Sequence, residues 1–457
     1  MDLAVRGAIV ISDGAYARDV LIRDGRIAAL VEPGASSADA EIDGRGLLAL
    51  PGVVDAHVHF NDPGRALWEG WTHGSRGAAA GGVTTVIDMP LNSLPPVLDG
   101  QAFDLKRIAG ERASIVDFAL WGGLVGSDTT PLRDLAARGA VGVKAFLCDS
   151  GVAEFPAVAA AELVPAMRAA AASGLLVAVH AEDDDVVREA TDRVRAFGRR
   201  DVGAWLASRP VAAEARAVAR ACDAAREAGA TLHVVHLSAV DALGAIGVAR
   251  AAGTDVTVET CAHYLVFDDA DALIHGPLLK CAPPIRDGAN RDALWDALQG
   301  GRIDLVASDH SPCLAADKRR GSDDIFAAWG GVTGVQSLLP ALFTEARRRA
   351  GGAFDVRKIA GFIAWRLAAK PALRFGLGER KGRIAPGYDA DIVLFDPDRE
   401  WTLDPAAVQT RSGLTPYAGR PFTGAVVRTL VRGTTVYDEG AFPAAPGHGR
   451  FVPARAA

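Results

Sequence analysis

The spacing of apolar and polar positions changes twice along the chain. Between about residue 51 and residue 385, short and nearly continuous apolar runs alternate with longer alanine-rich segments. A continuous apolar run is typical of a parallel strand buried on both faces, and an alanine-rich run favours a helix. The runs interpreted as strands are, in chain order, residues 52–60, 84–90, 117–123, 142–148, 175–182, 231–238, 255–264 and 303–312. Helices are expected between them, for example over residues 73–82, 160–174, 214–229 and 241–253.

This succession of strand–helix units predicts the α/β class and, within it, a TIM (β/α)8 barrel. An open doubly wound sheet is the alternative. It is disfavoured because no Gly-x-Gly-x-x-Gly sequence follows the first run.

The two ends of the chain alternate apolar and polar residues instead. At the start, residues 3–12, 17–24 and 25–31 show this pattern, and Asp-Gly pairs at 13–14, 24–25 and 43–44 are typical of hairpin turns. Residues 391–397 and 424–440 are similar. We therefore expect a small β-sandwich domain built from both termini, residues 1–50 and 386–457, beside a barrel over residues 51–385.

Composition excludes several classes of function. The net charge of −7 leaves no basic surface for nucleic acid or for an acidic membrane. The five cysteines form no Cys-x-x-Cys pair, which is typical of reduced thiols. No secretory leader is recognisable, and no apolar run reaches the roughly 18 residues of a membrane span. The expectation is a cytoplasmic protein that binds neither nucleic acid nor membrane.

Potential metal ligands recur at the C-terminal ends of the predicted strands, where TIM barrels carry their active sites. A single histidine or aspartate there has an ordinary structural interpretation, such as a buried hydrogen bond or a helix N-cap. Five of the eight predicted strands carry such a residue, however, and this favours one shared site. The residues are His57, His59, Lys144, His180, His236 and Asp309.

Lys144 stands in the middle of an apolar run, where an unpaired ammonium costs several kcal/mol. The four histidines and one aspartate exceed the three protein ligands of a single catalytic zinc, and they suit two divalent ions about 3.5–4 Å apart. Two such cations need an anion between them. Carbon dioxide would convert the neutral Lys144 amine into a carbamate, N6-carboxylysine, with one oxygen for each metal. A salt bridge from Lys144 to a nearby carboxylate, such as Asp149, is the alternative.

Motifs along nearly the whole chain resemble the cyclic amidohydrolase branch of the amidohydrolase superfamily. They include PGVVDAHVHF, GGVTTVIDMP, VHAED, HLSA, KCAPPIRD, SDHSP and KGRIAPGYDADIVLFDP. Within this branch the chain is most similar to the allantoinases, through DPGRALWEGW, DMPLNSLPP, FLCDSGVAEFP, AWGGVTGVQ and TPYAGRPFTGAVVRTLVRG. The resemblance implies an enzyme of purine breakdown, a homotetramer, in which a hydroxide bridging two metals opens the cyclic amide of (S)-allantoin to give allantoate.

The resemblance also implies residue roles. One metal is expected on His57, His59 and Asp309, and the other on His180 and His236, with carboxylated Lys144 as the bridge. Asp309 is the expected general base and acid. Zinc is the expected metal, and cobalt, manganese and iron fit the same ligands. The expected substrate contacts are Asn92, Ala282 and Trp329.

Related activities differ at identifiable positions. Dihydroorotases typically carry an arginine where this chain has Asn61, and dihydropyrimidinases and hydantoinases an aromatic residue where it has Asp149. A hydantoinase-type enzyme is the nearest alternative. A non-catalytic adaptor is a more distant one, since such relatives lack ligands that this chain keeps. His263 and His310 are expected near the site, and Cys313 close to it without being a nucleophile. A structural or surface role is expected for His73, His233, His275 and His448.

Overall fold

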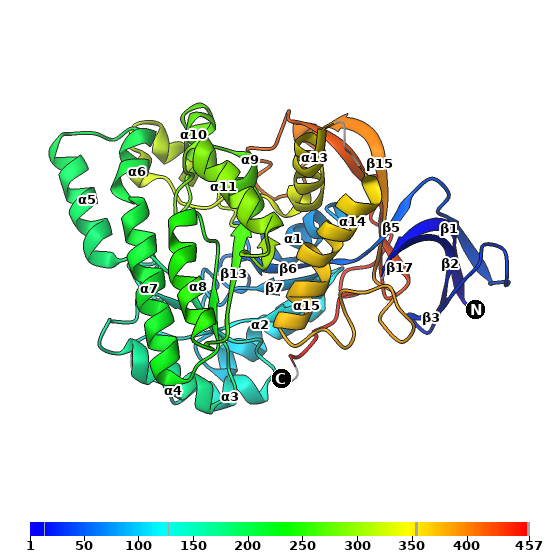
Figure 1. Ribbon diagram of the computed structural model, residues 1–457, viewed down its shortest axis with the longest axis horizontal. Coiled ribbons are helices and arrows are strands. Elements are labelled where there is room, and N and C mark those ends of the chain that lie inside the picture. The colour runs from blue at the N-terminus through cyan, green and yellow to red at the C-terminus, as the bar shows by residue number, and fades with distance from the viewer. Residues whose placement is uncertain (13, 127, 352–354, 455–457) are drawn as a thin grey trace.

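The computed structural model describes residues 1–12, 14–126, 128–351 and 355–454. A barrel of strands surrounded by helices lies at one end of its long axis, and a β domain lies at the other (Figure 1). All eight predicted barrel strands are present, the third of them in two pieces. Their bounds are β6 (Val53–Val58), β7 (Val83–Asp88), β8 (Asp117–Leu120), β9 (Gly122–Gly123), β10 (Val143–Phe146), β11 (Val177–His180), β12 (Leu232–Val234), β13 (Val256–Cys261) and β14 (Leu305–Ala307).

The barrel is closed by two arcs of parallel strands, β6-β7-β8 and β9-β10-β11-β12-β13-β14. Trp121 separates the arcs because the chain changes partner there: β8 pairs with β7, and β9 pairs with β10. A parallel bridge between Val58 and His310 joins the other two ends. The TIM barrel is therefore confirmed, and the open doubly wound alternative is wrong.

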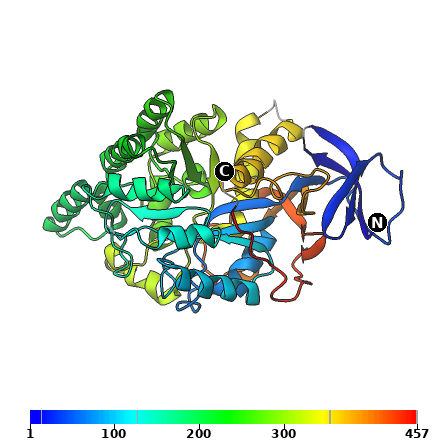
Figure 2. The same cartoon turned by 90° about the horizontal axis from the view of Figure 1, so that it is seen from below.

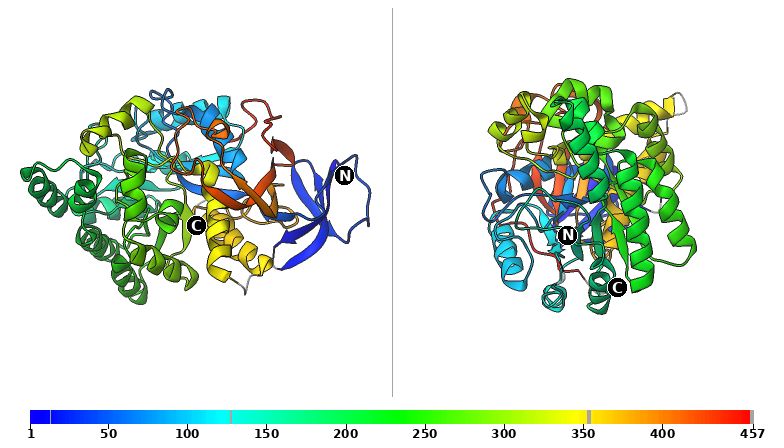
Figure 3. Two further views of the ribbon diagram at one scale, coloured as in Figure 1. Left: turned by 90° about the horizontal axis from the view of Figure 1, so that it is seen from above. Right: turned by 90° about the vertical axis from the view of Figure 1, so that its left-hand side faces the viewer.

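Helices pack around the outside of the strands (Figures 2 and 3). The longest of them, α7, presents alanine, valine and cysteine to the barrel and ends at Gly229, whose φ of 64° only a glycine adopts easily. No helix in the described ranges is both long and apolar enough to cross a membrane. The helix bounds are α1 (Gly70–Ala80), α2 (Gly100–Ala113), α3 (Leu132–Ala137), α4 (Leu163–Ala172), α5 (Asp184–Ala196), α6 (Val202–Ser208), α7 (Val211–Ala228), α8 (Leu243–Ala251), α9 (Ala262–Val266), α10 (Asp269–His275), α11 (Gly288–Gln299), α12 (Ala315–Arg319), α13 (Leu338–Ala350), α14 (Val356–Ala364) and α15 (Lys370–Arg374).

Strands from both ends of the chain form one sheet beside the barrel, in the order β17-β16-β15-β5-β1-β2-β3, with β4 also paired to β1. Its apolar side chains, among them Val10, Ile27 and Ile392, make a core of their own. The chain's small β domain is thus a product of both termini. The bounds are β1 (Leu3–Ile11), β2 (Ala15–Arg23), β3 (Arg26–Val31), β4 (Ala40–Asp43), β5 (Leu48–Pro51), β15 (Ile392–Thr402), β16 (Pro421–Val431) and β17 (Thr434–Asp438).

The three predicted hairpin turns have different outcomes. Asp24 and Gly25, both at positive φ, connect the antiparallel pair β2 and β3 as expected. The expectation at Asp43-Gly44 is wrong, because β4 and β5 both run parallel to β1 and do not pair with each other. Residue 13 of the first pair lies outside the described residues.

The last part of the chain leaves the sheet and returns to the barrel. Phe451 forms a parallel bridge with Phe118 of β8, and the Val452 amide donates to the Phe118 carbonyl at 2.8 Å. Figure 2 shows this red segment crossing the barrel. The domain boundaries at residues 50/51 and 385/386 stay predictions.

Candidate metal centre

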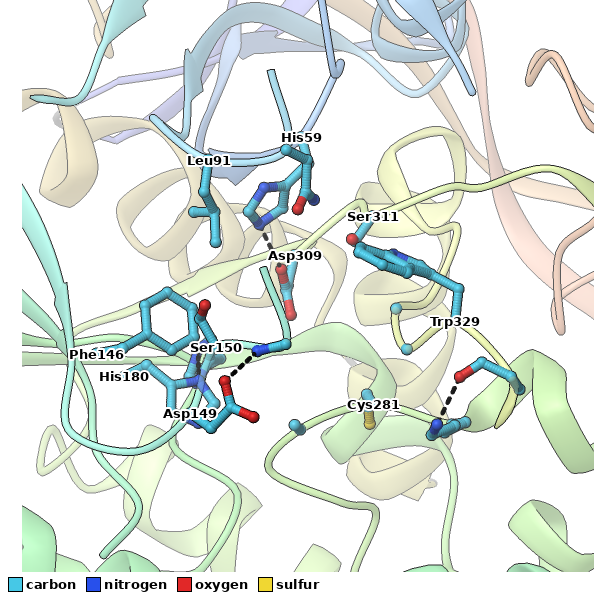
Figure 4. Close-up of a pocket in the computed structure, with 18 of the residues that line it drawn as sticks. His59, Leu91, Phe146, Asp149, Ser150, His180, Cys281, Asp309, Ser311 and Trp329 are labelled. Atoms are coloured by element: carbon cyan, nitrogen blue, oxygen red, sulfur yellow. Dashed lines mark hydrogen bonds and ion pairs between the residues drawn. The ribbon is translucent and has the colours of Figure 1, made fainter. Parts of the chain in front are cut away.

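The predicted ligands are brought together in one cavity at the C-terminal ends of the barrel strands. The cavity has a volume of about 460 Å³. Each of the six side chains is less than a tenth exposed. Figure 4 shows His59 and Asp309 on one side of this cavity and His180 on another. The six residues are His57, His59, Lys144, His180, His236 and Asp309.

The first group of ligand atoms comes from the ends of β6 and β14. Asp309 Oδ1 lies 3.4 Å from His57 Nε2 and 3.5 Å from His59 Nε2. Burial raises the pKa of Asp309, but the His57 and His59 rings outweigh it and hold this pKa well below its usual value. The group therefore offers two imidazole nitrogens and an ionised carboxylate to one point in space.

The second group comes from β11 and from the turn after β12. His180 Nδ1 and His236 Nε2 lie 3.1 Å apart, and the His180 ring stacks on Phe146 at 4.6 Å. Burial lowers the pKa of both histidines, so that both rings are neutral. A neutral imidazole is the form that binds a metal. The two nitrogens face one another as a pair of ligands would.

A buried carboxylate orients the first group. Glu259, on β13, accepts from His57 Nδ1 at 2.7 Å and from His233 Nε2 at 3.1 Å. Burial opposes ionisation of Glu259, but these two rings hold its pKa at about 2. With its Nδ1–H donated to Glu259, His57 presents Nε2 as a lone pair toward Asp309. His233, expected to be structural, thus supports the centre indirectly.

Glu182 does the same for the second group. It accepts from His180 Nε2 at 2.8 Å, which leaves Nδ1 free to face His236. Burial raises the pKa of Glu182, but Arg209 and the His180 ring hold it at about 2. The sequence analysis missed Glu182 and Glu259. The signal was available, since each is a carboxylate within a run interpreted as a buried strand.

Lys144 has no counter-ion. Apart from the Phe146 ring, 5.2 Å from Nζ, the described residues give its amine neither a hydrogen bond nor an ion pair. The alternative of a salt bridge to Asp149 is therefore wrong; that carboxylate accepts from the Gly151 amide at 3.0 Å. Burial lowers the pKa of Lys144 to about 8, although Asp309 and Glu259 raise it. A neutral amine, the form that adds carbon dioxide, is thus accessible near neutral pH.

Backbone strain accumulates around the same cavity. Non-glycine residues with positive φ include His236 at 39° and Asp309 at 44°, and also Asn61 and Asn92, which follow β6 and β7. Such conformations cost about 1–3 kcal/mol each and persist where the surrounding structure imposes them. Here they turn the side chains of two predicted ligands into the cavity.

The predicted substrate contacts also line the cavity. Asn92, Ala282 and Trp329 all contribute to its wall, and the Trp329 ring packs edge-on against Trp68 at 4.7 Å. Gly330, missed by the sequence analysis, lines it as well. Its amide and carbonyl have no hydrogen-bond partner among the described residues. These groups are available to a ligand, and a contact with substrate stays a prediction.

Other residues considered from the sequence do not reach the cavity. His310 lies next to Asp309, but its ring is directed to Glu69 at 3.4 Å and to the Gly334 amide at 3.2 Å. His263 is buried near Asp309, and neither of its ring nitrogens has a partner among the described residues. Cys313 lines a separate, smaller pocket, and burial raises its thiol pKa.

Comparison with known proteins assigns this chain to a family. The profile of the amidohydrolase family matches residues 48–436. The chain belongs to the amidohydrolase family. The predicted class of enzyme, a hydrolase of amide bonds, is confirmed by this membership.

Several named proteins are similar to this chain over almost its full length. A protein named allantoinase from Solibacter usitatus is 47% identical over 94% of this chain and 92% of its own. Another from Rubrobacter xylanophilus is 44% identical over 99% and 97%. The solved structure of L-hydantoinase (dihydropyrimidinase) from Arthrobacter aurescens superposes with a TM-score of 0.94 at 34% identity, covering 99% of both chains. Dihydropyrimidinase from Brevibacillus agri gives 0.91 at 30% identity with the same coverage.

Proposed function

We propose that this protein hydrolyses the cyclic amide bond of (S)-allantoin to give allantoate. The observation that carries the proposal is the convergence of six buried side chains with metal-binding chemistry on one cavity. The choice of allantoin rests on relatives of that name, at 47% and 44% identity over more than nine tenths of the chain.

The donor set fits two divalent metals. His57, His59 and Asp309 would hold one, and His180 with His236 the other. Neutral imidazoles, oriented by buried carboxylates, and one carboxylate suit zinc, and cobalt, manganese and iron are the alternatives. The amine of Lys144, buried without a counter-ion, would be carboxylated and would bridge them. When bound, such a metal pair polarises a carbonyl and lowers the pKa of water.

Asp309 is the proposed proton carrier. The neighbouring histidines keep it ionised, so its carboxylate can accept the proton of the attacking water. The water oxygen would bond to the carbonyl carbon, the ring C–N bond would break, and Asp309 would return the proton to the departing nitrogen. Its position beside both His57 and His59 supports a proton transfer at the proposed metal centre.

The charged groups around the cavity favour a neutral substrate. Asn61 stands where dihydroorotases typically have an arginine, and it is fully buried with its amide donating to the Pro312 carbonyl at 3.2 Å. Both arginines that line the cavity are already paired, Arg209 with Glu182 and Arg320 with Asp317. An uncharged ureide fits this wall better than a substrate with a carboxylate.

The alternative of a hydantoinase or dihydropyrimidinase is supported by the fold, through the TM-score of 0.94. Against it stands Asp149, an exposed carboxylate on the cavity wall in place of the expected aromatic ring. A carboxylate accepts hydrogen bonds from the N–H groups of the ureido arm of allantoin, which hydantoin and dihydrouracil lack.

Turnover of allantoin, hydantoin, dihydrouracil and dihydroorotate, measured side by side on metal-loaded protein, tests the proposal. We expect kcat/KM for allantoin to exceed the others by at least about tenfold. A larger value for hydantoin or dihydrouracil contradicts it. A non-catalytic adaptor predicts no stoichiometric metal, so metal analysis of the same sample separates this class. The homotetramer and the cytoplasmic location stay predictions.

A further inference from the structure

One wall of the cavity is held by two buried lysines that the metal centre does not use. Lys280, which follows a short 3-10 helix (Gly276–Leu279), is 5% exposed, and Lys318, on α12, is 7% exposed. Neither forms an ion pair with a carboxylate in the described part of the chain. A buried ammonium without an anion is costly, so its other contacts must explain it.

Those contacts are main-chain carbonyls of residues 326–331 and, for Lys280, the Trp205 ring, whose centroid lies 4.3 Å from Nζ. Lys280 Nζ donates to Phe326 O at 3.1 Å and to Ala328 O at 2.5 Å. Lys318 Nζ donates to Trp329 O at 3.0 Å and to Gly331 O at 2.6 Å. Hydrogen bonds from a charged donor are stronger than neutral ones. The two lysines thus fix the direction of four carbonyl groups within six consecutive residues.

This segment has little regular secondary structure. Beyond the single 3-10 turn Ile325–Ala327, its main chain is neither helix nor strand. Its other main-chain amides donate to nearby residues: Phe326 N to Asp324 Oδ1 at 2.9 Å, Trp329 N to Asp317 O at 3.3 Å and Gly331 N to Lys280 O at 2.8 Å. The two lysines hold four of the segment's six main-chain carbonyls.

The same segment forms the cavity wall opposite the metal centre's second group. All six residues line the cavity, and they include Trp329 and the unpartnered main-chain groups of Gly330. Figure 4 shows Trp329 and Cys281 on the side away from His180. Burial lowers the pKa of Lys280 to about 7 and of Lys318 to about 8.

We propose that Lys280 and Lys318 are positioning residues, which hold the 326–331 wall in the shape that receives the substrate ring. The proposal rests on the proposed function, because it assumes that a cyclic amide occupies this cavity. Among the described residues, neither lysine forms a hydrogen bond or ion pair with a predicted metal ligand, so the two act on substrate binding and not on the metal centre. Loss of either should therefore raise KM.

The test replaces each lysine by methionine, which keeps the length of the side chain and removes its charge and donors. For Lys280→Met and Lys318→Met we expect KM to rise by at least about tenfold, with kcat within about threefold of wild type. Metal content should be unchanged. Lys280→Arg and Lys318→Arg, which keep a cationic donor, should recover part of the lost affinity. The matched control is Lys370→Met, whose lysine pairs with Asp304 on the barrel away from the cavity and should leave KM unaltered.

KM within about twofold of wild type in both methionine variants overturns the proposal. A fall in kcat with loss of metal at unchanged KM overturns it too, because that result assigns the lysines to general stability. If the methionine variants do not fold, Lys280→Gln and Lys318→Gln, which keep a neutral donor, are judged by the same criteria. If wild type prefers another cyclic amide to allantoin, the proposed function fails, and KM for that substrate still decides the role of the lysines.

Discussion

Two clusters of buried charge in this molecule differ in how their charges are compensated. One is the predicted metal centre at the C-terminal ends of the barrel strands. The other joins the barrel to the small β domain, where Asp117, Asp389 and Asp391 are close enough to hold a metal between them. Burial and close spacing alone do not distinguish the two clusters.

Counter-ions distinguish them. In the domain-joining cluster Lys381 Nζ lies 2.5 Å from Asp117, 2.7 Å from Asp391 and 3.0 Å from Asp389, and Arg432 also pairs with Asp117. The chain itself supplies the cations, so nothing further needs to bind. In the metal centre Lys144 forms no ion pair with any described residue, and the ligand nitrogens of His180 and His236 face one another. Incomplete compensation identifies the functional cluster.

Replacing Lys144 should have the largest effect on metal binding and turnover. Lys144→Ala removes the amine that, in our proposal, carbon dioxide converts to the bridging anion, so two metals bound there would repel each other without compensation. We expect loss of bound metal and of measurable turnover, checked by metal analysis and by allantoin hydrolysis. Short carboxylic acids added to the variant should restore part of both, because they supply the missing anion. Retention of both metals in Lys144→Ala without any additive would show that Lys144 is not the bridge.

Asp309→Asn should have the next largest effect. The amide keeps the shape of the side chain and one ligand oxygen, but it cannot accept a proton as the carboxylate does. We expect metal content close to wild type and kcat lower by about 10²–10⁴-fold, the usual contribution of general acid–base catalysis. Wild-type turnover in this variant is incompatible with the role of proton carrier.

Lys381→Met tests the other cluster. It leaves three buried carboxylates without their shared cation, which costs about 3–5 kcal/mol of stability. We expect a lower free energy of unfolding in denaturant titration, with metal content and kcat per folded chain unchanged. Loss of metal at unchanged stability would contradict the division between the two clusters.

Glu259→Gln should have the smallest effect of the four. The carboxylate accepts hydrogen bonds from His57 Nδ1 and from His233 Nε2, and an amide has only one oxygen to accept them. The metal-facing nitrogen of His57 is therefore oriented less well. We expect metal affinity to fall by about 10–100-fold, measured by competition with a chelator. The control is Glu111→Gln, on the exposed face of α2, which should change nothing.

Much of this arrangement could be predicted from the sequence because its signals are local. The barrel strands are short apolar runs, and a histidine or lysine within such a run is conspicuous. The partners of these residues could not be predicted, because they depend on which strands become neighbours. Glu259 acquires its role only when β13 lies beside β12, and His57 is 202 residues away from it.

The same limit explains the wrong turn. The Asp43-Gly44 pair has the composition of a hairpin, but β4 and β5 each find a better partner in β1, whose alternating pattern offers a full edge. Likewise, the composition of residues 117–123 predicts one continuous strand. It divides at Trp121 because the chain changes partner there, from β7 to β10. The Trp121 indole N–H donates to Ala56 O at 3.1 Å.

A crystal structure of the active, metal-loaded protein tests the central claim most directly. It should show two metal ions in the cavity and continuous electron density for a carboxyl group on Lys144 Nζ, with one oxygen on each ion. An unmodified Lys144 amine in a fully loaded crystal whose protein hydrolyses allantoin would contradict it.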